Sequence, residues 1–486
     1  MTDRTAPALL PADMARNKRS WRCSPVDCGG FSSLLKMAAS TGLTEQAELF
    51  TAGQKGDMLP LVLSGCVGLL MSDDRGRKTL VKIVGPGQFV GQNLVLTDDS
   101  GCFSARALTA ARVTGISKDE IRHALDTNSC FRRFFVGTMS EGLRESVTLF
   151  SRLKLMSAPQ RLGAHLLSIV GCNHGPARLH ISVERQALAE MLGMQPESLS
   201  RAFLKLAELG VSRWERNVIT IDEVERLAAF CEAASALSPI SGQAAEEGEP
   251  WKMPRRGFSS DALHTLMPDT ALFSLLPEAE TKALLAKARL VSYEHKTTLF
   301  QSGGRADHCF VVIGGQVRLF VTKADGRETT INLIQTGESF AEAALLGSGC
   351  YPVNAEVQPG TRLLHIPKEA LLNRILATST LTLPLLEKLA RRQRQLFESI
   401  MEFKTCTPTE RLVLELLKLT DVESGAATVS LKMPKAALAS HLGVAPESLS
   451  RIFSRLKPLG IKTSPTSKVY ISEVAALRGY SKQTVA

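Results

Sequence analysis

Two kinds of hydrophobic pattern alternate along the chain, and the alternation occurs twice. Residues 48–117 and 298–367 consist of short β-branched and apolar runs punctuated by glycines such as Gly65, Gly87 and Gly315. Short strands at regular spacing with glycine turns predict a small antiparallel barrel or roll. Each of these regions is followed by a long stretch with helical periodicity. The pattern therefore predicts a mixed α+β fold in which a roll precedes a long helix.

One face of each predicted long helix is apolar. The stripe consists of Met139, Leu143, Val147, Phe150 and Leu153 in the first helix and of Leu385, Leu389, Leu396, Ile400 and Phe403 in the second. Such a stripe has to be buried. It packs either against the roll of its own half or against the other long helix, as in a coiled coil. Gly137 and Gly142 are expected to weaken the first helix locally.

The chain contains an internal repeat at an offset of 250 residues. Residues 188–211 (LAEMLGMQPESLSRAFLKLAELGV) and 438–461 (LASHLGVAPESLSRIFSRLKPLGI) are identical at 14 of 24 positions. The same offset aligns LSGCVGLL with IGGQVRLF (63–70 and 313–320) and GQFVGQ with GESFAE (87–92 and 337–342). The sequence thus predicts two copies of one module of roughly 200–220 residues, since self-similarity at a fixed period marks a repeat architecture. Residues 232–257 are rich in Ala, Ser, Gly, Pro and Glu and read as a flexible linker.

The repeated segment predicts a helix-turn-helix in each half. In the first copy a short helix spans 183–192 with Ser182 as its N-cap, and Gly193 supplies the turn. Pro196 begins the second helix, because the first helical turn tolerates a missing N–H. Leu199, Phe203 and Leu206 form its buried face. Pro434, Gly443 and Pro446 repeat this arrangement in the second copy.

The exposed face of each second helix carries the motif P-E-S-L-S-R. Glu, Ser and Arg suit the reading of DNA, since Arg can bond guanine O6 and N7 while Glu accepts from cytosine N4. A Glu/Arg pair at i, i+4 could instead be a simple surface ion pair. Because both copies keep the motif while the rest diverges, we predict recognition helices. The expected DNA-binding residues are Glu197, Ser200, Arg201, Glu447, Ser450 and Arg451.

A short turn-rich stretch after each recognition helix predicts a β-hairpin wing. Arg213 and Arg216 in the first wing, and Lys462 and Lys468 in the second, are expected to contact phosphates. Residues 157–231 hold eight Lys/Arg and eight Asp/Glu, whereas residues 404–486 hold twelve and six. Since phosphate contacts supply much of the affinity, the second half is expected to dominate DNA binding.

Composition narrows the class of protein. The 486 residues carry a net charge of +10 and 44% hydrophobic residues, which is compatible with a nucleic-acid partner and with folded cores. The sequence has no apolar run long enough for a membrane span and no signal peptide at its start, so a cytoplasmic protein without membrane attachment is expected. Ten scattered cysteines form no CxxC and fit no metal site, so free thiols are expected. No P-loop, GxSxG, HExxH or dinucleotide fingerprint occurs, which argues against an enzyme.

The order roll, long helix, helix-turn-helix and wing, with GQFVGQ/GESFAE and PESLSR, resembles the Crp/Fnr family of bacterial transcription regulators. The second copy, with GESFAEAAL and YPVNAEV, is most similar to the branch that governs denitrification and nitric-oxide responses. The resemblance implies two cyclic-nucleotide-binding-like β-rolls, each with a dimerisation-type helix and a winged helix-turn-helix. The implied divisions are 29–156, 157–231, a linker at 232–262, 263–403 and 404–486.

The resemblance also implies partners. Family members usually dimerise through the long helix, bind double-stranded DNA and act on RNA polymerase, and those with Glu, Ser and Arg at the matching positions read TTGAT-type half-sites. One chain would then hold both halves of a dimer, because a flexible linker of this length spans roughly 25–30 Å. An intermolecular homodimer with four recognition helices is the alternative architecture. A regulatory subunit whose tandem rolls restrain a protein partner is the alternative function.

The sequence does not identify the effector that the rolls bind. The family's nucleotide binders use a Gly-Glu pair for ribose and an Arg-Ser pair for phosphate; here stand Gly91-Gln92 and Gly101-Cys102, then Ala341-Glu342 and Tyr351-Pro352. Without the arginine, cyclic AMP is not expected. Cys23 and Cys28 alone do not supply the four ligands of an iron–sulfur cluster. Haem remains an alternative, with no ligand singled out among His123, His264, His295, His308 and His365. Either roll could also bind nothing.

Overall fold

The computed structural model describes most of the chain. The described residues are 40–54, 57–72, 76, 78–96, 103–170, 174–181, 183–212, 218–232, 273, 277–322, 328–347, 349–377, 379–431, 435–464 and 468–483. Residues 233–262 of the expected linker lie outside this set, as do Ser182, Arg213, Arg216 and Pro434.

Each half begins with the predicted roll, built from two antiparallel sheets around an apolar core. In the first roll the sheet orders are β1-β7-β3 and β2-β6-β4-β5; in the second they are β10-β17-β12-β15 and β11-β16-β13-β14. The strands of the first roll are β1 (Ser40–Leu43), β2 (Glu48–Phe50), β3 (Met58–Ser64), β4 (Val67–Ser72), β5 (Lys78–Val84), β6 (Phe103–Ala107) and β7 (Ala111–Ser117). Those of the second are β10 (Arg289–Tyr293), β11 (Thr297–Phe300), β12 (His308–Gly314), β13 (Gln316–Thr322), β14 (Glu328–Gln335), β15 (Ser339–Phe340), β16 (Asn354–Val357) and β17 (Thr361–Pro367).

Helices flank each roll and lead into the long helix. The first half has α2 (Asn93–Leu96), α3 (Lys118–Thr127) and the long α4 (Ser129–Leu155). The second has α10 (Glu278–Leu285), α11 (Glu342–Leu346), α12 (Lys368–Ala377) and the long α13 (Ser379–Thr405). Both long helices contain 27 residues, which makes each about 40 Å long. The offset of 250 residues seen in the sequence therefore holds for whole elements.

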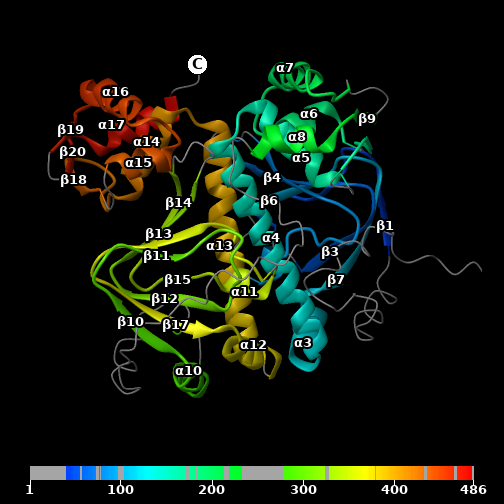
Figure 1. The fold of residues 1–486 in the computed structure, drawn as a ribbon, viewed down its shortest axis with the longest axis horizontal. Helices are drawn as coiled ribbons and strands as arrows, with labels where there is room; N and C mark the ends of the chain where they lie inside the picture. Colours follow the sequence, from blue (N-terminus) through cyan, green and yellow to red (C-terminus); the bar gives the residue numbers. More distant parts are fainter. Residues whose placement is uncertain are drawn as a thin grey trace, which may run out of the picture.

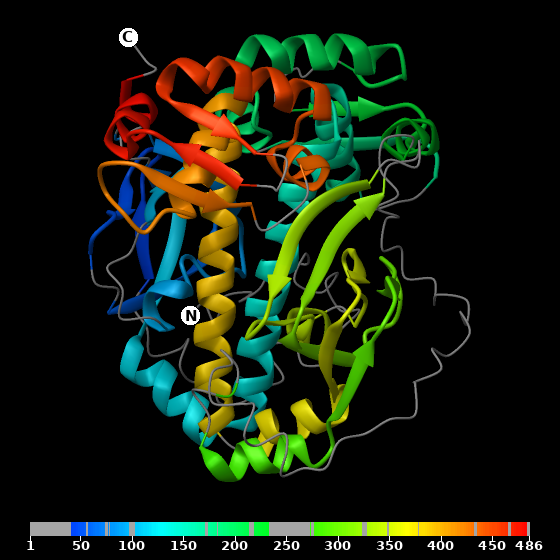
Figure 2. The ribbon, with the colours of Figure 1, turned by 90° about the vertical axis from the view of Figure 1, so that its left-hand side faces the viewer.

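The two long helices pack against each other along the middle of the molecule and run in the same direction (Figures 1 and 2). The rings of Phe150 and Phe403 meet edge to face with centroids 6.1 Å apart. At Gly142 the helices approach so closely that a Cβ would lie 2.9 Å from the Gln393 amide nitrogen. The apolar stripes thus form a seam between the halves, which decides between the two packing alternatives.

A winged helix-turn-helix follows each long helix. The first consists of α5 (Ala158–Ile169), β8 (Ala177–His180), α6 (Arg185–Met191), α7 (Pro196–Ala207), β9 (Val218–Ile221) and α8 (Val224–Glu232). The second consists of α14 (Pro408–Lys418), β18 (Ala427–Ser430), α15 (Lys435–Leu442), α16 (Pro446–Leu456), a 3-10 turn (Lys457–Leu459), β19 (Ile461–Thr463), β20 (Lys468–Ile471) and α17 (Val474–Gln483). Since α13 continues to Thr405, the break before this second unit lies two residues beyond the boundary expected at 403.

The hydrophobic core is divided unevenly between the halves. One cluster joins both rolls, α4, α13 and the first winged helix-turn-helix. A second cluster lies wholly within the second winged helix-turn-helix, around Leu412, Leu438, Leu456 and Ile471. This unit therefore has a core of its own. In the described part of the chain, no helix combines the length and apolar character needed to cross a membrane.

Candidate nucleic-acid interface

The predicted recognition helices are present in both halves. α7 begins at Pro196 and buries Leu199, Ala202, Phe203 and Leu206, as the spacing of its apolar residues requires. The other face leaves Glu197, Ser200 and Arg201 exposed. α16 begins at Pro446 and is equally amphipathic, with a buried face made by Leu449, Ile452, Phe453 and Leu456. Its Glu447, Ser450 and Arg451 are exposed.

The first helix of the first copy is shorter than predicted. α6 begins at Arg185 with Glu184 in the N-cap position, and it ends at Met191. Residue 183 has no helical conformation, so the predicted start was two residues too early. The Glu184 side chain makes no capping hydrogen bond, so local sequence signals for this end were weak.

Glycine is required at the turn of each helix-turn-helix. Gly193 has φ 63° and Gly443 has φ 71°, both in the left-handed region. A Cβ on Gly193 would lie 2.7 Å from Leu153 in α4, and one on Gly443 would lie 2.7 Å from Phe403 in α13. The turn of each unit therefore rests directly on the C-terminal end of its own long helix. This contact fixes where the recognition helix begins.

The exposed acidic and basic residues of the recognition helices are not paired with one another. Among the described residues no ion pair joins Glu197 to Arg201 or Glu447 to Arg451. Instead, Arg201 donates a long hydrogen bond of 3.4 Å to the Ser198 hydroxyl. Such side chains are available to an external partner.

The wings are present where the sequence predicted them. β19 and β20 form an antiparallel hairpin, and Lys462 and Lys468 are exposed on it. In the first half, β9 pairs with β8, and Val211 forms an isolated bridge with Ile221. The tip of this wing, which carries Arg213 and Arg216, lies outside the described residues.

The two recognition helices occupy the same end of the molecule. In Figure 1, α7 and α16 both lie at the top, beyond the C-terminal ends of α4 and α13. Figure 2 shows both helices along that upper surface, opposite the end that carries α10 and α12. One chain therefore presents both predicted recognition helices at one end, joined through the central helix pair.

Two equivalent lysines connect each long helix to the other half. Lys404 in α13 donates to the carbonyl oxygens of Leu80 in β5 and Glu190 in α6, both at 2.8 Å. Lys154 in α4 donates to the carbonyl oxygen of Thr330 in β14 at 3.2 Å. Residues 154 and 404 are related by the repeat offset of 250. Each long helix thus contacts one strand of the opposite roll, β5 in the first roll and β14 in the second, which we call the flap strands.

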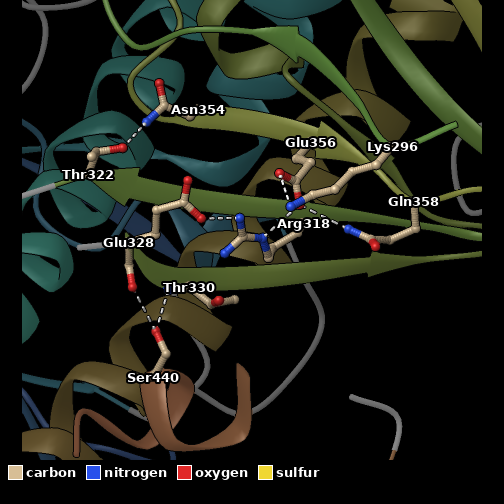
Figure 3. Close-up of polar contacts among 9 residues, drawn as sticks. All are labelled: Lys296, Arg318, Thr322, Glu328, Thr330, Asn354, Glu356, Gln358 and Ser440. Carbon is tan, nitrogen blue, oxygen red and sulfur yellow. Dashed lines mark hydrogen bonds and ion pairs between the residues drawn. The ribbon is translucent and has the colours of Figure 1, made fainter. Parts of the chain in front are cut away.

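The flap strand of the second roll, β14, in turn contacts the second helix-turn-helix (Figure 3). The Thr330 N–H donates to the Ser440 hydroxyl of α15 at 2.8 Å. The neighbouring strand β13 supplies Arg318, which pairs with Glu328 of β14 and Glu356 of β16 and so links the three strands. Through these bonds, the position of the second recognition helix depends on the first half of the chain.

Burial changes the acidity of both lysines. Loss of solvation lowers the pKa of Lys154 from 10.5 to about 7, with nearby Arg411 adding to the effect. Burial likewise lowers the pKa of Lys404 to about 7, against the attraction of Glu190. The apolar periodicity of the helices does not single out these lysines. Their identity at the repeat offset, which within the long helices is shared only by Ser129/Ser379 and Arg144/Arg394, is the signal that could have found them.

The nucleotide-binding positions are occupied by other chemistry. Glu342 is buried at the start of α11 and is bound by Lys388 of α13, so its carboxylate is already neutralised. In the first half, the equivalent Gln92 donates to the Thr138 hydroxyl at 2.9 Å. Tyr351 occupies the position of the phosphate-binding arginine in the family's nucleotide binders, and it stacks on Phe300 with ring centroids 3.7 Å apart.

The described histidines and cysteines form no metal site. Among the described residues, no group of three or more His, Cys, Asp or Glu could hold a metal ion. His365 is a core residue, hydrogen-bonded to the Tyr293 hydroxyl at 3.0 Å, and burial lowers its pKa to about 3. Cys23, Cys28 and His264 lie outside the described residues.

Comparison with known proteins agrees with this arrangement. A model of the cyclic nucleotide-binding domain matches residues 43–128 and 290–378. A model of the Crp-like helix-turn-helix domain matches residues 160–230 and 410–480. The chain belongs to the Crp/Fnr family, in two tandem copies. It is a DNA-binding transcription regulator, not an enzyme.

Relatives within the Crp/Fnr family correspond to about half of this chain. The cyclic AMP receptor protein of Thermus thermophilus is 29% identical over 213 residues, 43% of this chain and 96% of that protein. A CRP-like cAMP-activated global transcriptional regulator of Mycobacterium tuberculosis is 23% identical over 207 residues, 42% of this chain and 92% of its own length. A solved structure from Ruegeria pomeroyi, described provisionally as a cyclic nucleotide binding protein, is 32% identical. It matches 46% of this chain and 100% of its own, with a TM-score of 0.35.

Proposed function

We propose that this Crp/Fnr protein regulates transcription as a single-chain dimer, with one DNA near-palindrome bound per chain. The observation that carries the proposal is the burial of both long-helix stripes against each other, with α7 and α16 exposed at the same end. An intermolecular dimer through the same seam would have to separate α4 from α13. Because the linked halves have a high effective concentration for each other, the single-chain arrangement is favoured.

The proposed reading residues are Glu197, Ser200 and Arg201 in one half-site and Glu447, Ser450 and Arg451 in the other. A recognition helix places its N-terminal residues against base edges, where Arg reads guanine and Glu accepts from cytosine. In the proposal both half-sites are of the TTGAT type, because both helices carry the same motif. Exposed Lys462 and Lys468, together with Arg213 and Arg216, bind the flanking phosphates.

The remaining parts of the proposal concern setting and partners. The protein acts in the cytoplasm, where DNA and RNA polymerase are its partners. We propose domain divisions at 29–156, 157–231, 263–405 and 406–486, with the linker between the halves, because α13 continues to Thr405. Exposed recognition helices in both halves argue against a subunit that merely restrains another protein. The haem alternative stays without a proposed ligand.

The stoichiometry on DNA tests the proposal. The purified protein would be mixed with a duplex that carries TTGAT-N4-ATCAA and, separately, with a scrambled duplex at near-physiological salt. Analytical ultracentrifugation would then give the mass of each complex. We expect a single 52.6 kDa chain on the specific duplex. Two chains per duplex would contradict the single-chain dimer, and equal weak binding to both duplexes would contradict the TTGAT half-sites.

A further inference from the structure

The two recognition helices begin alike and end in different chemistry. The six residues from Pro196 and from Pro446 are identical, and four exposed positions follow them within about two turns. In the first half these are Leu204, Lys205, Ala207 and Glu208; at the repeat offset of 250 they are Ser454, Arg455, Lys457 and Pro458. None of the four pairs is identical. The end of each recognition helix therefore distinguishes the two halves of the chain.

Leu204 lies on the face of α7 that carries the proposed reading residues. It follows Ser200 by four residues and Arg201 by three, which places the three side chains on one side of the helix. Its side chain is 55% exposed, more than any other large apolar side chain among the described residues. A lone surface leucine is ordinary elsewhere. Here it lies about one helical turn beyond the residues proposed to meet bases, so DNA bound to α7 would cover it.

The major groove offers one methyl group to an apolar side chain, the C5-methyl of thymine. The other groups that distinguish the base edges are hydrogen-bond donors and acceptors, which a leucine would leave unsatisfied. The counterpart on α16 is Ser454, whose hydroxyl donates to the Ser450 carbonyl oxygen at 3.1 Å. Serine has no apolar surface of comparable size. A methyl contact at this position is therefore available to the first half alone.

The charges beside these positions also differ between the halves. Lys205 is paired with Glu208 at 2.6 Å, so the first half has one cation and one carboxylate here. The second half has Arg455 and Lys457, and Pro458 stands in place of the glutamate. Among the described residues, no carboxylate lies within ion-pair distance of either cation. A phosphate is therefore attracted to the end of α16, whereas at the end of α7 it also meets the repulsion of Glu208.

We infer that the chain binds an asymmetric operator in one orientation, because Leu204 makes the first recognition helix specific for a thymine that the second does not read. The thymine methyl packs on Leu204 beside the bases that the shared Glu, Ser and Arg read. In the other half-site, Arg455 and Lys457 hold phosphates at the corresponding place and leave the base free to vary. The inference rests on the proposed single-chain dimer, whose two TTGAT-type cores are otherwise equivalent.

Deoxyuridine tests the inference, because it differs from thymidine only by the absent C5-methyl group. Three duplexes would carry TTGAT-N4-ATCAA flanked by A·T pairs, with deoxyuridine at no thymine, at every thymine of one half, or at every thymine of both halves. With both halves substituted, we expect the affinity to fall about fourfold, the effect of one buried methyl group. With one half substituted, the loss should stay below about twofold, because the chain can bind with α7 on the intact half. A contact made by both helices would instead give losses of about fourfold and then about sixteenfold.

Exchange of the two differing residues should change this result in opposite directions. Leu204→Ser, which gives α7 the side chain of α16, should remove the loss on the doubly substituted duplex. Ser454→Leu, which gives α16 the side chain of α7, should produce a loss of about fourfold when only one half is substituted. Ile169→Ser removes an exposed apolar side chain of α5, outside the recognition helix, and should alter neither result. Circular dichroism of each variant checks that it is folded.

The salt dependence of binding tests the difference in charge. Arg455→Gln should lower the slope of the logarithm of affinity against the logarithm of salt concentration by about one unit, because it removes a phosphate contact. Lys205→Gln should leave the slope nearly unchanged. Equal changes of slope in the two variants would contradict the proposed phosphate contact.

The outcomes separate this inference from the proposed function. A deoxyuridine loss that multiplies from one substituted half to two, or that persists in Leu204→Ser, would overturn the inference. Specific binding of one chain without any effect of the thymine methyl would refute only the asymmetry. Absence of a preference for TTGAT over the scrambled duplex, or two chains per duplex, would refute the proposed function as well.

Discussion

At the residue scale, the two halves carry the same Glu, Ser and Arg side chains on their proposed DNA-binding surfaces and different side chains in their interiors. Glu197, Ser200 and Arg201 have identical, equally exposed counterparts at the repeat offset. By contrast, Phe397 and Val147 occupy equivalent places, but Phe397 fills the interior beside the first roll whereas Val147 lines a cavity of about 320 Å³ beside the second. In the proposed function, both helices read the same kind of DNA edge, which would account for the shared surface chemistry. The interiors were free to diverge.

The recognition arginines give a prediction at this scale. Arg201→Ala and Arg451→Ala should each weaken binding to the TTGAT palindrome by about 1–3 kcal/mol, because each removes one bidentate base contact. Binding to the scrambled duplex should change little. Fluorescence anisotropy at fixed salt would measure both. Arg178→Ala, an exposed arginine on β8, serves as a control that should not discriminate between the duplexes. Equal losses on both duplexes would make these arginines phosphate contacts.

At the scale of the elements, the central feature is the pairing of α4 with α13. Gly142, which the sequence suggested as a weak point, lies within an unbroken helix at the place where the partner helix comes closest. The same helices end in Lys154 and Lys404, each of which holds the flap strand of the opposite half. The helix pair is thus both the seam between the two halves and the support of the two helix-turn-helix units.

The buried lysines predict a pH dependence of stability. Folding lowers their pKa from 10.5 to about 7, so the unfolded chain holds more protons between these values. The free energy of unfolding should therefore rise as the pH increases from 7 to 9, by about 2 kcal/mol per lysine. Urea unfolding under reducing conditions would measure it. Lys154→Met and Lys404→Met should each remove part of that rise, and an unaltered rise in both variants would contradict the assignment.

At the scale of the whole molecule, the two winged helix-turn-helix units differ in how they are packed and in their charge. The first winged helix-turn-helix shares the main core, whereas the second has a separate core and a more basic composition. The second winged helix-turn-helix is attached to the second roll through polar contacts such as that of Ser440 with Thr330. A site on DNA would accordingly be bound by two surfaces of different charge.

This charge difference gives a prediction for the intact protein. Replacement of Lys462 and Lys468 by Gln should reduce DNA affinity more than replacement of Arg213 and Arg216, because the second half has the excess of positive charge. A plot of the logarithm of the binding constant against the logarithm of the salt concentration should become shallower. Its slope should fall by about one unit for each phosphate contact removed. Titrations at several salt concentrations would measure both quantities. Equal losses for the two pairs would refute the dominance of the second half.

The sequence by itself determined what depends on local pattern. Apolar periodicity and glycine spacing identified the rolls, and the repeated PESLSR segment identified α7 and α16 with their starts at Pro196 and Pro446. These features follow from neighbouring residues, because capping, turns and amphipathic faces are set within one or two helical turns. The tandem order followed from the repeat itself.

Only the tertiary structure decided what depends on distant residues. It paired the stripe of α4 with that of α13, brought Lys404 to Leu80 and Glu190, and placed Val147 opposite the second roll. An apolar stripe indicates that a helix face is buried but does not name the surface that buries it. Likewise, a lysine or valine acquires its role from whichever part of the chain folds against it. The seam, the lysine contacts and the cavity beside Val147 arise from packing across the two halves, which no local pattern records.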